Sequence, residues 1–463
     1  MRGAALILAV VAVGATGAFA VDWQRAGDEA IDKLQAYVRV DTTNPPGNET
    51  PAADLLRDWL SREGIEVRLY DPMNDRKRQS LLARLPGRSG RSLVLMSHSD
   101  VVPAIKEEWH QPPFDGIVRN ESLYGRGTLD TKGLGILQLM TLVLMRRAGV
   151  VPNDDVLLLI EPDEEEAGRG MKGMLEHYPD VFGKVRMVLN EGGNGTRGVL
   201  QPGQVIFFVQ TAEKGAVWVK LTAHGRAGHA SVPIEDNAVT TMSRALDRIS
   251  RYETPLRPSQ TVVSLFAALA DESSFPNSFV MRHLDSSLVL GLFKSRLTER
   301  PLVNSLLRTT ISLTGVHGGY KTNVIPAQVD ATLDCRIVPG DSPDGLKAEL
   351  TRVVGDTRVD IELTQTGTPN ESPEDPELMK AVRQVTSRHH PGSIVAPLMS
   401  SGVTDSAYFR QRGDHAYGFN PFVLTEEEMA TMHGIDEHVR LDDLRAAVRM
   451  YYEIVAQLEG VGE

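Results

Sequence analysis

The chain has 463 residues, of which 41% are hydrophobic and 24% are charged, as is typical of a soluble globular protein with more than one domain. Its 49 Lys and Arg against 61 Asp and Glu give a net charge of −12, which argues against nucleic acid or an anionic membrane as the principal partner. The single cysteine, Cys335, cannot form an intramolecular disulfide, and we expect it to be a buried strand residue.

The first twenty residues predict a cleaved secretory signal. Arg2 precedes an apolar run over residues 4–15, and Ala18-Phe19-Ala20 supplies the small residues that signal peptidase reads. The alternative is an uncleaved anchor, for which the run is short against the roughly 20 apolar residues of a membrane span. No later stretch reaches that length. We therefore expect a secreted or periplasmic protein, tethered to a membrane only if the signal is retained.

The chain up to residue 210 alternates between helical and strand-like patterns. Helices are expected at 23–38, 52–63 and 133–147, and strands at 65–70, 80–84, 92–96, 156–160 and 188–190. The strands 92–96 and 156–160 are almost entirely apolar, so we expect them to be buried on both faces. Such alternation predicts an α/β fold, in which helices sandwich a mostly parallel sheet.

The pattern changes near residue 211 and changes back at Pro376. Between these points we expect strands at 217–222, 309–314, 329–337 and 359–364, and helices at 237–251 and 343–354. Two helices on one face of an antiparallel sheet predict a small α+β domain that is inserted into the first domain.

These patterns divide the chain into a signal and two domains. Residues 1–20 are the signal, residues 21–210 and 367–463 form the catalytic domain, and residues 211–366 form the inserted domain. The apolar clusters within residues 257–308 match neither the α/β nor the α+β pattern, and they predict no particular helix or strand.

Five segments carry potential metal ligands, and each follows a buried strand or lies in a loop beside one. They are Ser97-His98-Ser99-Asp100, Asp130 within 125–133, Asp163-Glu164-Glu165-Glu166, Asn190-Glu191-Gly192-Gly193, and His433-Gly434-Ile435-Asp436-Glu437-His438. In an open α/β sheet, ligand sites gather at the carboxyl ends of the strands, so these segments can converge. Two histidines and three carboxylates suit two divalent ions about 3.5 to 4 Å apart. Mixed nitrogen and oxygen ligands favour zinc, with cobalt or manganese as substitutes.

Taken alone, each of these segments also has a structural explanation. His98 and Asp100 lie on the same side of an extended chain and could be a simple hydrogen-bonded pair. Asp130 could cap the helix that follows it, and His433 could be structural. The acidic run could be a solvated loop, although four consecutive acids at a strand end repel one another unless a cation neutralises them.

In their order along the chain, these motifs resemble the dinuclear zinc amidohydrolases, a family that includes aminoacylase, glutamate carboxypeptidase, succinyl-diaminopimelate desuccinylase and the yeast vacuolar carboxypeptidase. The resemblance extends from about Ala36 to the C-terminus. It implies that Asp100 orients His98 and that Glu164 is the general base on a water held between two Zn²⁺ ions. It also implies five metal ligands: His98 and Glu191 on one ion, Glu165 and His433 on the other, and Asp130 between them.

The acidic run leaves two registers open. The family commonly shows two glutamates before a small or apolar residue, whereas this chain has three. Counting from Val156 without a gap makes Glu164 the base and Glu165 the ligand, while a slip of one residue makes them Glu165 and Glu166. We prefer the ungapped register.

The inserted domain resembles the lid and dimerisation domain of the family. The segment 225–231 matches the one whose histidine, here His229, reaches the active site of the partner subunit. Asn323 and Arg336 match positions that hold the substrate carboxylate, and Gly402 lies in a loop resembling the one that lines the same end of the substrate. Without the resemblance, Asn323 is a turn residue, Arg336 a surface arginine and His229 a local cap.

The resemblance therefore predicts a homodimeric exported enzyme that hydrolyses the amide bond of N-acyl amino acids or dipeptides with a free carboxylate. It is closest to the yeast carboxypeptidase and the secreted fatty-acyl amino acid hydrolases, which implies a roomy, partly apolar pocket. The alternative is a metal- or peptide-binding protein without catalysis, but Glu164 and all the metal positions are present. An endopeptidase is disfavoured, since Arg336 and Asn323 would read a terminal carboxylate that an internal peptide bond lacks.

Overall fold

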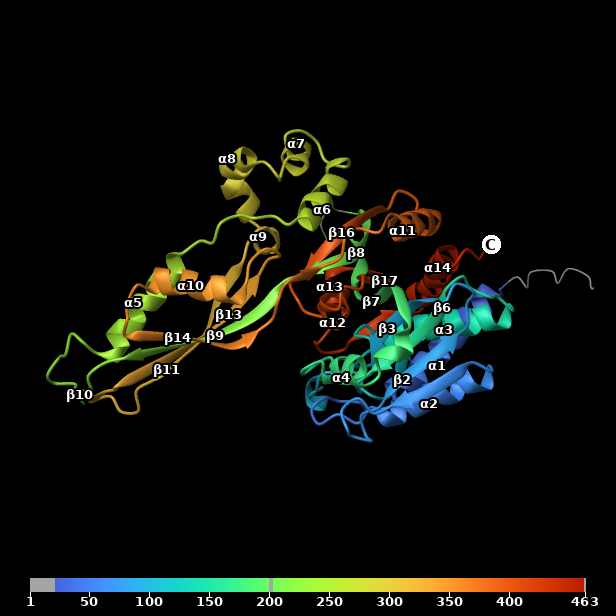
Figure 1. The fold of residues 1–463 in the computed structure, drawn as a ribbon, viewed down its shortest axis with the longest axis horizontal. Coiled ribbons are helices and arrows are strands. Elements are labelled where there is room, and N and C mark those ends of the chain that lie inside the picture. The colour runs from blue at the N-terminus through green and yellow to red at the C-terminus, as the bar shows by residue number, and fades with distance from the viewer. Residues whose placement is uncertain (1–20, 200–202, 462–463) are drawn as a thin grey trace, which may run out of the picture.

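The computed structural model describes residues 21–199 and 203–461, so the predicted signal lies outside the described residues. Two sheets lie one beyond the other along the long axis of the molecule (Figure 1). Within the described part of the chain, one sheet has nine strands and the other has four. Strands β8 (Val205–Glu213) and β9 (Gly215–His224) follow each other directly and connect the two.

The nine-stranded sheet has the order β1-β2-β6-β3-β7-β17-β8-β15, with β16 paired to β8. Pairing is parallel at its centre, between β6, β3, β7 and β17, and also between β8 and β16, which confirms the predicted mostly parallel sheet. The pairings of β1 with β2, β2 with β6 and β15 with β8 are antiparallel. Besides β8, its strands are β1 (Glu66–Tyr70), β2 (Ser80–Leu85), β3 (Arg91–His98), β6 (Asp155–Glu161), β7 (Lys184–Arg197), β15 (Asn370–Glu371), β16 (Ile394–Ser400) and β17 (Ala416–Leu424).

Helices cover both faces of this sheet. The middle of β3 is apolar at four consecutive positions, and its alternate side chains point to opposite layers: Leu93 and Leu95 pack under one set of helices and Val94 and Met96 under the other. The first set is α1 (Trp23–Val38), α2 (Thr50–Arg62), α3 (Lys132–Arg147), α11 (Pro376–His389) and α14 (Leu441–Leu458). The second set includes α4 (Arg169–His177), η2 (Pro179–Phe182) and α12 (Ser406–Gln411).

The four-stranded sheet is antiparallel and has the order β11-β13-β9-β14. Its strands alternate apolar and polar residues, so Val217, Val219 and Leu221 of β9 pack against two helices while Trp218 points to the other face. Cys335 is buried in the same layer, as predicted, and burial raises the pKa of its thiol to about 12. The elements are β11 (Thr310–Gly318), β13 (Gln328–Ile337), β14 (Val359–Thr366), α5 (Ala238–Arg251) and α10 (Pro343–Val354).

Residues 257–308, which the sequence pattern left unassigned, contain four helices: α6 (Gln260–Ala270), α7 (Asn277–Arg282), α8 (Ser287–Thr298) and α9 (Pro301–Leu307). They pack against β8 and β16 of the nine-stranded sheet rather than against the four-stranded one. Apolar residues lie on more than one side of these short helices, which is why no clear helical period is visible in the sequence.

The remaining elements are short. They are η1 (Lys106–Glu108), β4 (Ile117–Arg119), β5 (Ser122–Tyr124), β10 (Gly228–His229), β12 (Val324–Ile325), α13 (Glu426–Met429) and β18 (His438–Arg440). Among the described residues, no helix is both long and apolar enough to cross a bilayer.

Candidate active site

The predicted metal ligands converge at the carboxyl ends of the central parallel strands. His98 is the last residue of β3, Glu165 lies in the turn after β6, and Glu191 lies in the second half of β7. Asp130 directly precedes the first residues of α3, and His433 lies between α13 and β18. Parallel strands bring their carboxyl ends to one edge of a sheet, which explains why segments far apart in sequence meet here.

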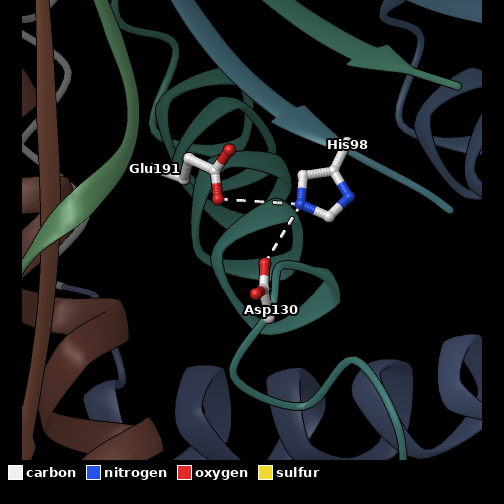
Figure 2. A group of neighbouring side chains, drawn as sticks. All are labelled: His98, Asp130 and Glu191. Atoms are coloured by element: carbon white, nitrogen blue, oxygen red, sulfur yellow. Dashed lines mark hydrogen bonds and ion pairs between the residues drawn. The ribbon is translucent and has the colours of Figure 1, made fainter. Parts of the chain in front are cut away.

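Two groups of three side chains offer ligand atoms that lie within 4.8 Å of one another. In the first, Nε2 of His98 lies 3.1 Å from Oδ1 of Asp130 and 3.6 Å from Oε2 of Glu191 (Figure 2). In the second, Nε2 of His433 lies 2.9 Å from Oδ2 of Asp130 and 3.2 Å from Oε2 of Glu165. The two groups share only Asp130, and each of its oxygens faces a different group.

This donor set fits two divalent cations. Imidazole nitrogen and carboxylate oxygen are the ligands that zinc, cobalt and manganese accept. Glu165 also has a buried oxygen, Oε1, without a hydrogen-bond partner, which a cation would satisfy. Its neighbour Glu166 is exposed, so the ungapped register of the acidic run agrees with the geometry.

The charges of the cluster favour a cation. Burial alone lowers the pKa of His98, but the neighbouring carboxylates, Glu191 first, outweigh burial and hold that pKa well above its ordinary value. Hydrogen bonds with Asp130 and Glu165 raise the pKa of His433 to about 10. Burial raises the pKa of Glu191 to about 7, although His98 lowers it. Without metal, the cluster therefore retains protons that bound cations would displace.

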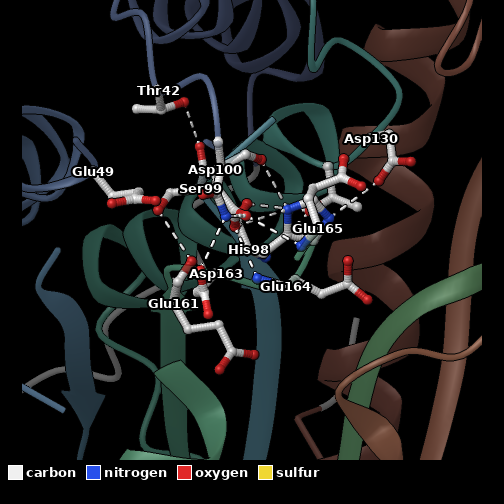
Figure 3. Close-up of polar contacts among 12 residues, drawn as sticks. Thr42, Glu49, His98, Ser99, Asp100, Asp130, Glu161, Asp163, Glu164 and Glu165 are labelled. Atoms are coloured by element: carbon white, nitrogen blue, oxygen red, sulfur yellow. Dashed lines mark hydrogen bonds and ion pairs between the residues drawn. The ribbon is translucent and has the colours of Figure 1, made fainter. Parts of the chain in front are cut away.

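Asp100 contacts both His98 and the acidic loop that contains Glu164 and Glu165. Nδ1 of His98 lies 2.9 Å from the backbone oxygen of Asp100 and 3.5 Å from its carboxylate. The same carboxylate accepts hydrogen bonds from the backbone N–H groups of Glu164 and Glu165, at 3.2 and 3.1 Å (Figure 3). It also accepts one from Nδ2 of Asn44 at 2.9 Å. Asp100 thus connects the histidine to the loop that carries two further site residues.

The acidic run does not depend on a cation along its whole length. Asp163 is buried and pairs with Arg78 at 2.8 Å and with Arg169 at 2.8 Å. Arg78 is also buried and forms a second ion pair, with Glu49. Sequence reasoning treated the four acids as one group, whereas the structure neutralises the first with arginines and directs the next two toward the cluster.

A second supporting residue, Glu437, was not singled out by sequence reasoning. Its buried carboxylate accepts hydrogen bonds from the backbone N–H groups of Leu129 and Asp130, at 2.7 and 3.1 Å, and pairs with Arg126 at 2.6 Å. It therefore fixes the loop that presents Asp130. The only sequence signal was its position four residues after His433.

A cleft of about 300 Å³ opens over the cluster. Burial raises the pKa of Glu164, which lines this cleft, well above its ordinary value, and Glu191 adds to the rise. A carboxyl group of this kind is suited to general acid–base chemistry. The lining residues come from both sheets and their loops: Asp130, Glu164, Glu165, Glu191, Ala216, Trp218, Arg336, Gln365, Val403, Thr404 and His433.

Arg336 and the loop of Gly402 lie at the same side of the cleft. Arg336 forms an ion pair with Asp334, with Nε and Nη2 at 2.8 and 3.0 Å from its two oxygens, and its Nη1 lies 3.4 Å from the backbone oxygen of Ser401. Gly402 itself is exposed and donates its N–H to Ser400. The side chains of Val403 and Thr404, rather than Gly402, line the cleft.

The structure separates His229 and Asn323 from the other predicted site residues. β10 and β12 pair with each other, so the backbone of His229 lies opposite Val324, and the N–H of Ala230 donates to the oxygen of Asn323 at 3.1 Å. Both side chains are exposed, and neither lines the cleft. β10 lies at the end of the four-stranded layer farthest from the nine-stranded sheet (Figure 1).

A second cleft, of about 420 Å³, lies at the amino ends of β3 and β7. Its lining includes Arg91 and Arg186, but both arginines pair with the buried carboxylate of Asp154. Among the described residues, both groups with metal-ligand geometry belong to the first cleft, which is therefore the candidate active site.

Comparisons with known proteins identify relatives of the chain. Residues 94–457 match the model of peptidase family M20/M25/M40. Human N-fatty-acyl-amino acid synthase/hydrolase PM20D1 is 30% identical over 374 residues, which cover 78% of this chain and 73% of the relative. A probable carboxypeptidase S-like 2 of Dictyostelium discoideum is 28% identical over 378 residues, 80% of this chain and 72% of that protein.

The solved structures show the same fold. The M20 family metallo-carboxypeptidase Sso-CP2 from Sulfolobus solfataricus matches with a TM-score of 0.69 and 19% identity, over 94% of this chain and all of that one. The central, mostly parallel sheet flanked by helices is thus a shared architecture.

Proposed function

The chain belongs to peptidase family M20/M25/M40 and is a metallo-hydrolase of amide bonds, and we propose that its substrates are N-acyl amino acids or dipeptides with a free carboxylate. The observation that carries this proposal is the sharing of Asp130 between two ligand groups in a cleft that also contains Glu164 and Arg336. The names of the human and Dictyostelium relatives support the substrate class.

Two Zn²⁺ ions, held by the five cluster residues, would polarise the amide carbonyl and lower the pKa of the attacking water. Glu164 acts as the general base: it takes a proton from that water and passes it to the leaving nitrogen. Its raised pKa suits this role, since a base must hold the proton between the two transfers. Asp100 keeps the backbone of the Glu164 loop in position.

Charge and apolar contact together orient the substrate. Arg336 binds the free carboxylate, for which a guanidinium offers two parallel donors. Trp218 and Val403 line the same cleft with half-exposed apolar surface, 48% and 45% exposed, against which an acyl chain or a side chain packs. Sequence reasoning predicted a partly apolar pocket without naming Trp218, and it included Val403 only in the loop 401–405 at the carboxylate end of the substrate.

A second copy of the chain completes the site. His229 and Asn323 are exposed at the far end of the four-stranded layer, where side chains without a role in their own cleft are free to reach another molecule. In an isologous dimer, each copy supplies these two residues to the other. His229 then stabilises the oxyanion that forms on the amide carbonyl, and Asn323 contributes to carboxylate binding.

A hydrolysis screen tests the proposal. N-acyl amino acids with acyl chains from two to eighteen carbons, dipeptides, and the matching carboxamides are incubated with the enzyme, with and without chelator, and the metal content is measured by elemental analysis. We expect zinc-dependent cleavage that is much faster for the free acids than for the matching carboxamides. Glu164→Gln should lose several orders of magnitude in rate and keep its metal. Bound zinc with no cleavage of any substrate would favour a non-catalytic binding protein.

A further inference from the structure

Residues 275–302, from just before α7 into α9, carry five exposed large apolar side chains, which we call the outer apolar face: Phe275, Phe279, Leu288, Leu292 and Leu302. Phe275, Leu292 and Leu288 are 80%, 72% and 69% exposed. Other apolar residues of the same segment, among them Val289 and Leu297, are buried against the rest of the core under β8 and β16. The outer side chains are therefore not needed for that packing, and exposed apolar surface of this kind marks an interaction site.

The outer apolar face lies on the outside of the molecule. α7 and α8 project beyond both sheets (Figure 1). Within α8, Leu288, Leu292 and Arg296 follow one another at intervals of four residues, so they lie on one side of the helix, while Val289 and Leu297 lie on the packed side. The exposed side thus combines leucines with a cation.

The charge of this segment differs from that of the chain. Residues 277–308 contain five Lys and Arg against two Asp and Glu, in a protein whose net charge is −12, although Arg282 pairs with Asp271, and Lys294 and Arg308 pair with Glu253, outside this range. Arg296 and Arg300 are exposed, and neither forms an ion pair within the described residues. Unpaired arginines beside exposed leucines match a surface that is both apolar and anionic.

We propose that the outer apolar face docks the protein on an anionic lipid surface. The leucine and phenylalanine side chains enter the headgroup layer, and Arg296 and Arg300 contact lipid phosphates. The proposed binding is peripheral and involves only these surface side chains. The proposal stands on its own surface and does not depend on amide hydrolysis. If the proposed substrates are correct, long-chain N-acyl amino acids would collect at the same surface.

Co-sedimentation with vesicles tests the proposal. The exported chain is mixed with vesicles of phosphatidylcholine alone or with 30% phosphatidylglycerol, and the bound fraction is measured at low and high salt. We expect binding to the anionic vesicles that weakens as salt rises. The variant L288S/L292S should bind about tenfold more weakly, because two exposed apolar anchors are lost. R296E/R300E should bind anionic vesicles more weakly by at least fivefold for each arginine replaced, and its binding to phosphatidylcholine vesicles should not change.

The control variant is I105S/V151S, which removes two other exposed apolar side chains outside this segment, at 58% and 53% exposure, and should bind as the parent does. All variants share one N-terminus, so residues 1–20 cannot cause a difference. Absence of binding, or equal binding of parent and L288S/L292S, overturns the proposal. The proposal is also overturned if L288S/L292S differs from the parent in the mass measured by sedimentation velocity but still binds vesicles. That result would mean that the outer apolar face binds a second copy of the chain. If L288S/L292S fails to fold, the exposed charge reversal R296E/R300E gives the answer.

Discussion

Oδ2 of Asp130 lies 2.9 Å from Nε2 of His433, while the other oxygen of the same carboxylate faces His98. One side chain therefore serves both ligand groups, and its removal should affect both cations. We expect Asp130→Ala to bind no cation tightly and His433→Ala to keep one. The measurement is metal content by elemental analysis after dialysis.

Asp58→Ala, which removes an exposed carboxylate far from the cluster in sequence, is the control and should keep two cations. An Asp130→Ala protein with two tightly bound cations would show that another residue bridges them. A His433→Ala protein with no cation would show that the two sites bind only together.

Metal affinity should rise with pH. Hydrogen bonds with Asp130 and Glu165 raise the pKa of His433 to about 10 in the metal-free protein, so this imidazole is protonated at neutral pH. A proton must leave before a cation binds, and its loss becomes easier as pH increases toward 10. The apparent affinity for zinc should therefore increase by about tenfold per pH unit for each proton released, between pH 6 and 9.

Calorimetry in two buffers with different ionisation enthalpies measures the number of protons released on binding. Release of one proton or more at pH 7 is expected, and His433→Ala should release fewer. An affinity that does not change between pH 6 and 9 would contradict the raised pKa of His433.

Arg336 should discriminate between acids and amides. Its guanidinium lines the cleft and is 30% exposed, so loss of its pair with a substrate carboxylate should cost about 2 kcal/mol, at the lower end of the range for buried pairs. We expect Arg336→Ala to lower kcat/KM about thirtyfold for N-acyl amino acids and to leave the slower reaction of their carboxamides nearly unchanged. Equal losses on both substrates would mean that Arg336 only supports the four-stranded layer.

Trp218 should set the dependence on acyl chain length. A methylene group that is fully buried contributes about 0.8 kcal/mol, and beside a half-exposed indole about half of that is expected, or roughly a twofold gain in kcat/KM per carbon. Trp218→Ala should flatten this gain across a series of N-acyl glycines, whereas Val239→Ala, an exposed apolar residue outside the cleft, should not. An unchanged slope would place the acyl chain elsewhere.

The sequence was most informative where a motif coincided with a strongly patterned element. The apolar runs at 92–96 and 156–160 predicted the central strands, and the residues after them hold the cluster, so fold and family were both predicted correctly. Pairing partners at long range were not predictable. The ion pairs of Asp163 with Arg78, and the hydrogen bonds of Glu437 with the Asp130 loop, join residues 85 and more than 300 positions apart.

The helices within 257–308 were not predictable from the sequence. Their apolar residues face both the core and the solvent, so the sequence has no single period that would separate a packed side from an exposed one. Asn323 and Arg336 show a related limit: motifs placed both on the substrate carboxylate, yet only Arg336 lines the cleft of its own chain.

The last prediction concerns His229, whose ring accepts a hydrogen bond from the backbone N–H of Ser231 at 3.2 Å and contacts the hydroxyl of the same residue at 2.7 Å. These contacts are local and leave the exposed ring able to serve another molecule. If His229 donates to the oxyanion in the partner's cleft, its loss should lower kcat by about 10² to 10³. If it only orders its own turn, His229→Ala should lower stability and leave kcat nearly unchanged.

Mixing two inactive variants separates these outcomes. In a dimer of His229→Ala with Glu164→Gln, one cleft combines the intact Glu164 of the first chain with the intact His229 of the second, and the other cleft lacks both. Activity should therefore return toward half of the value per parent dimer, because one complete site is formed. Native mass spectrometry must show that mixed dimers are present. Mixed dimers without activity would mean that His229 does not act across the interface. Activity that returns when the two variants are combined, although no mixed dimers form, would exclude a shared site.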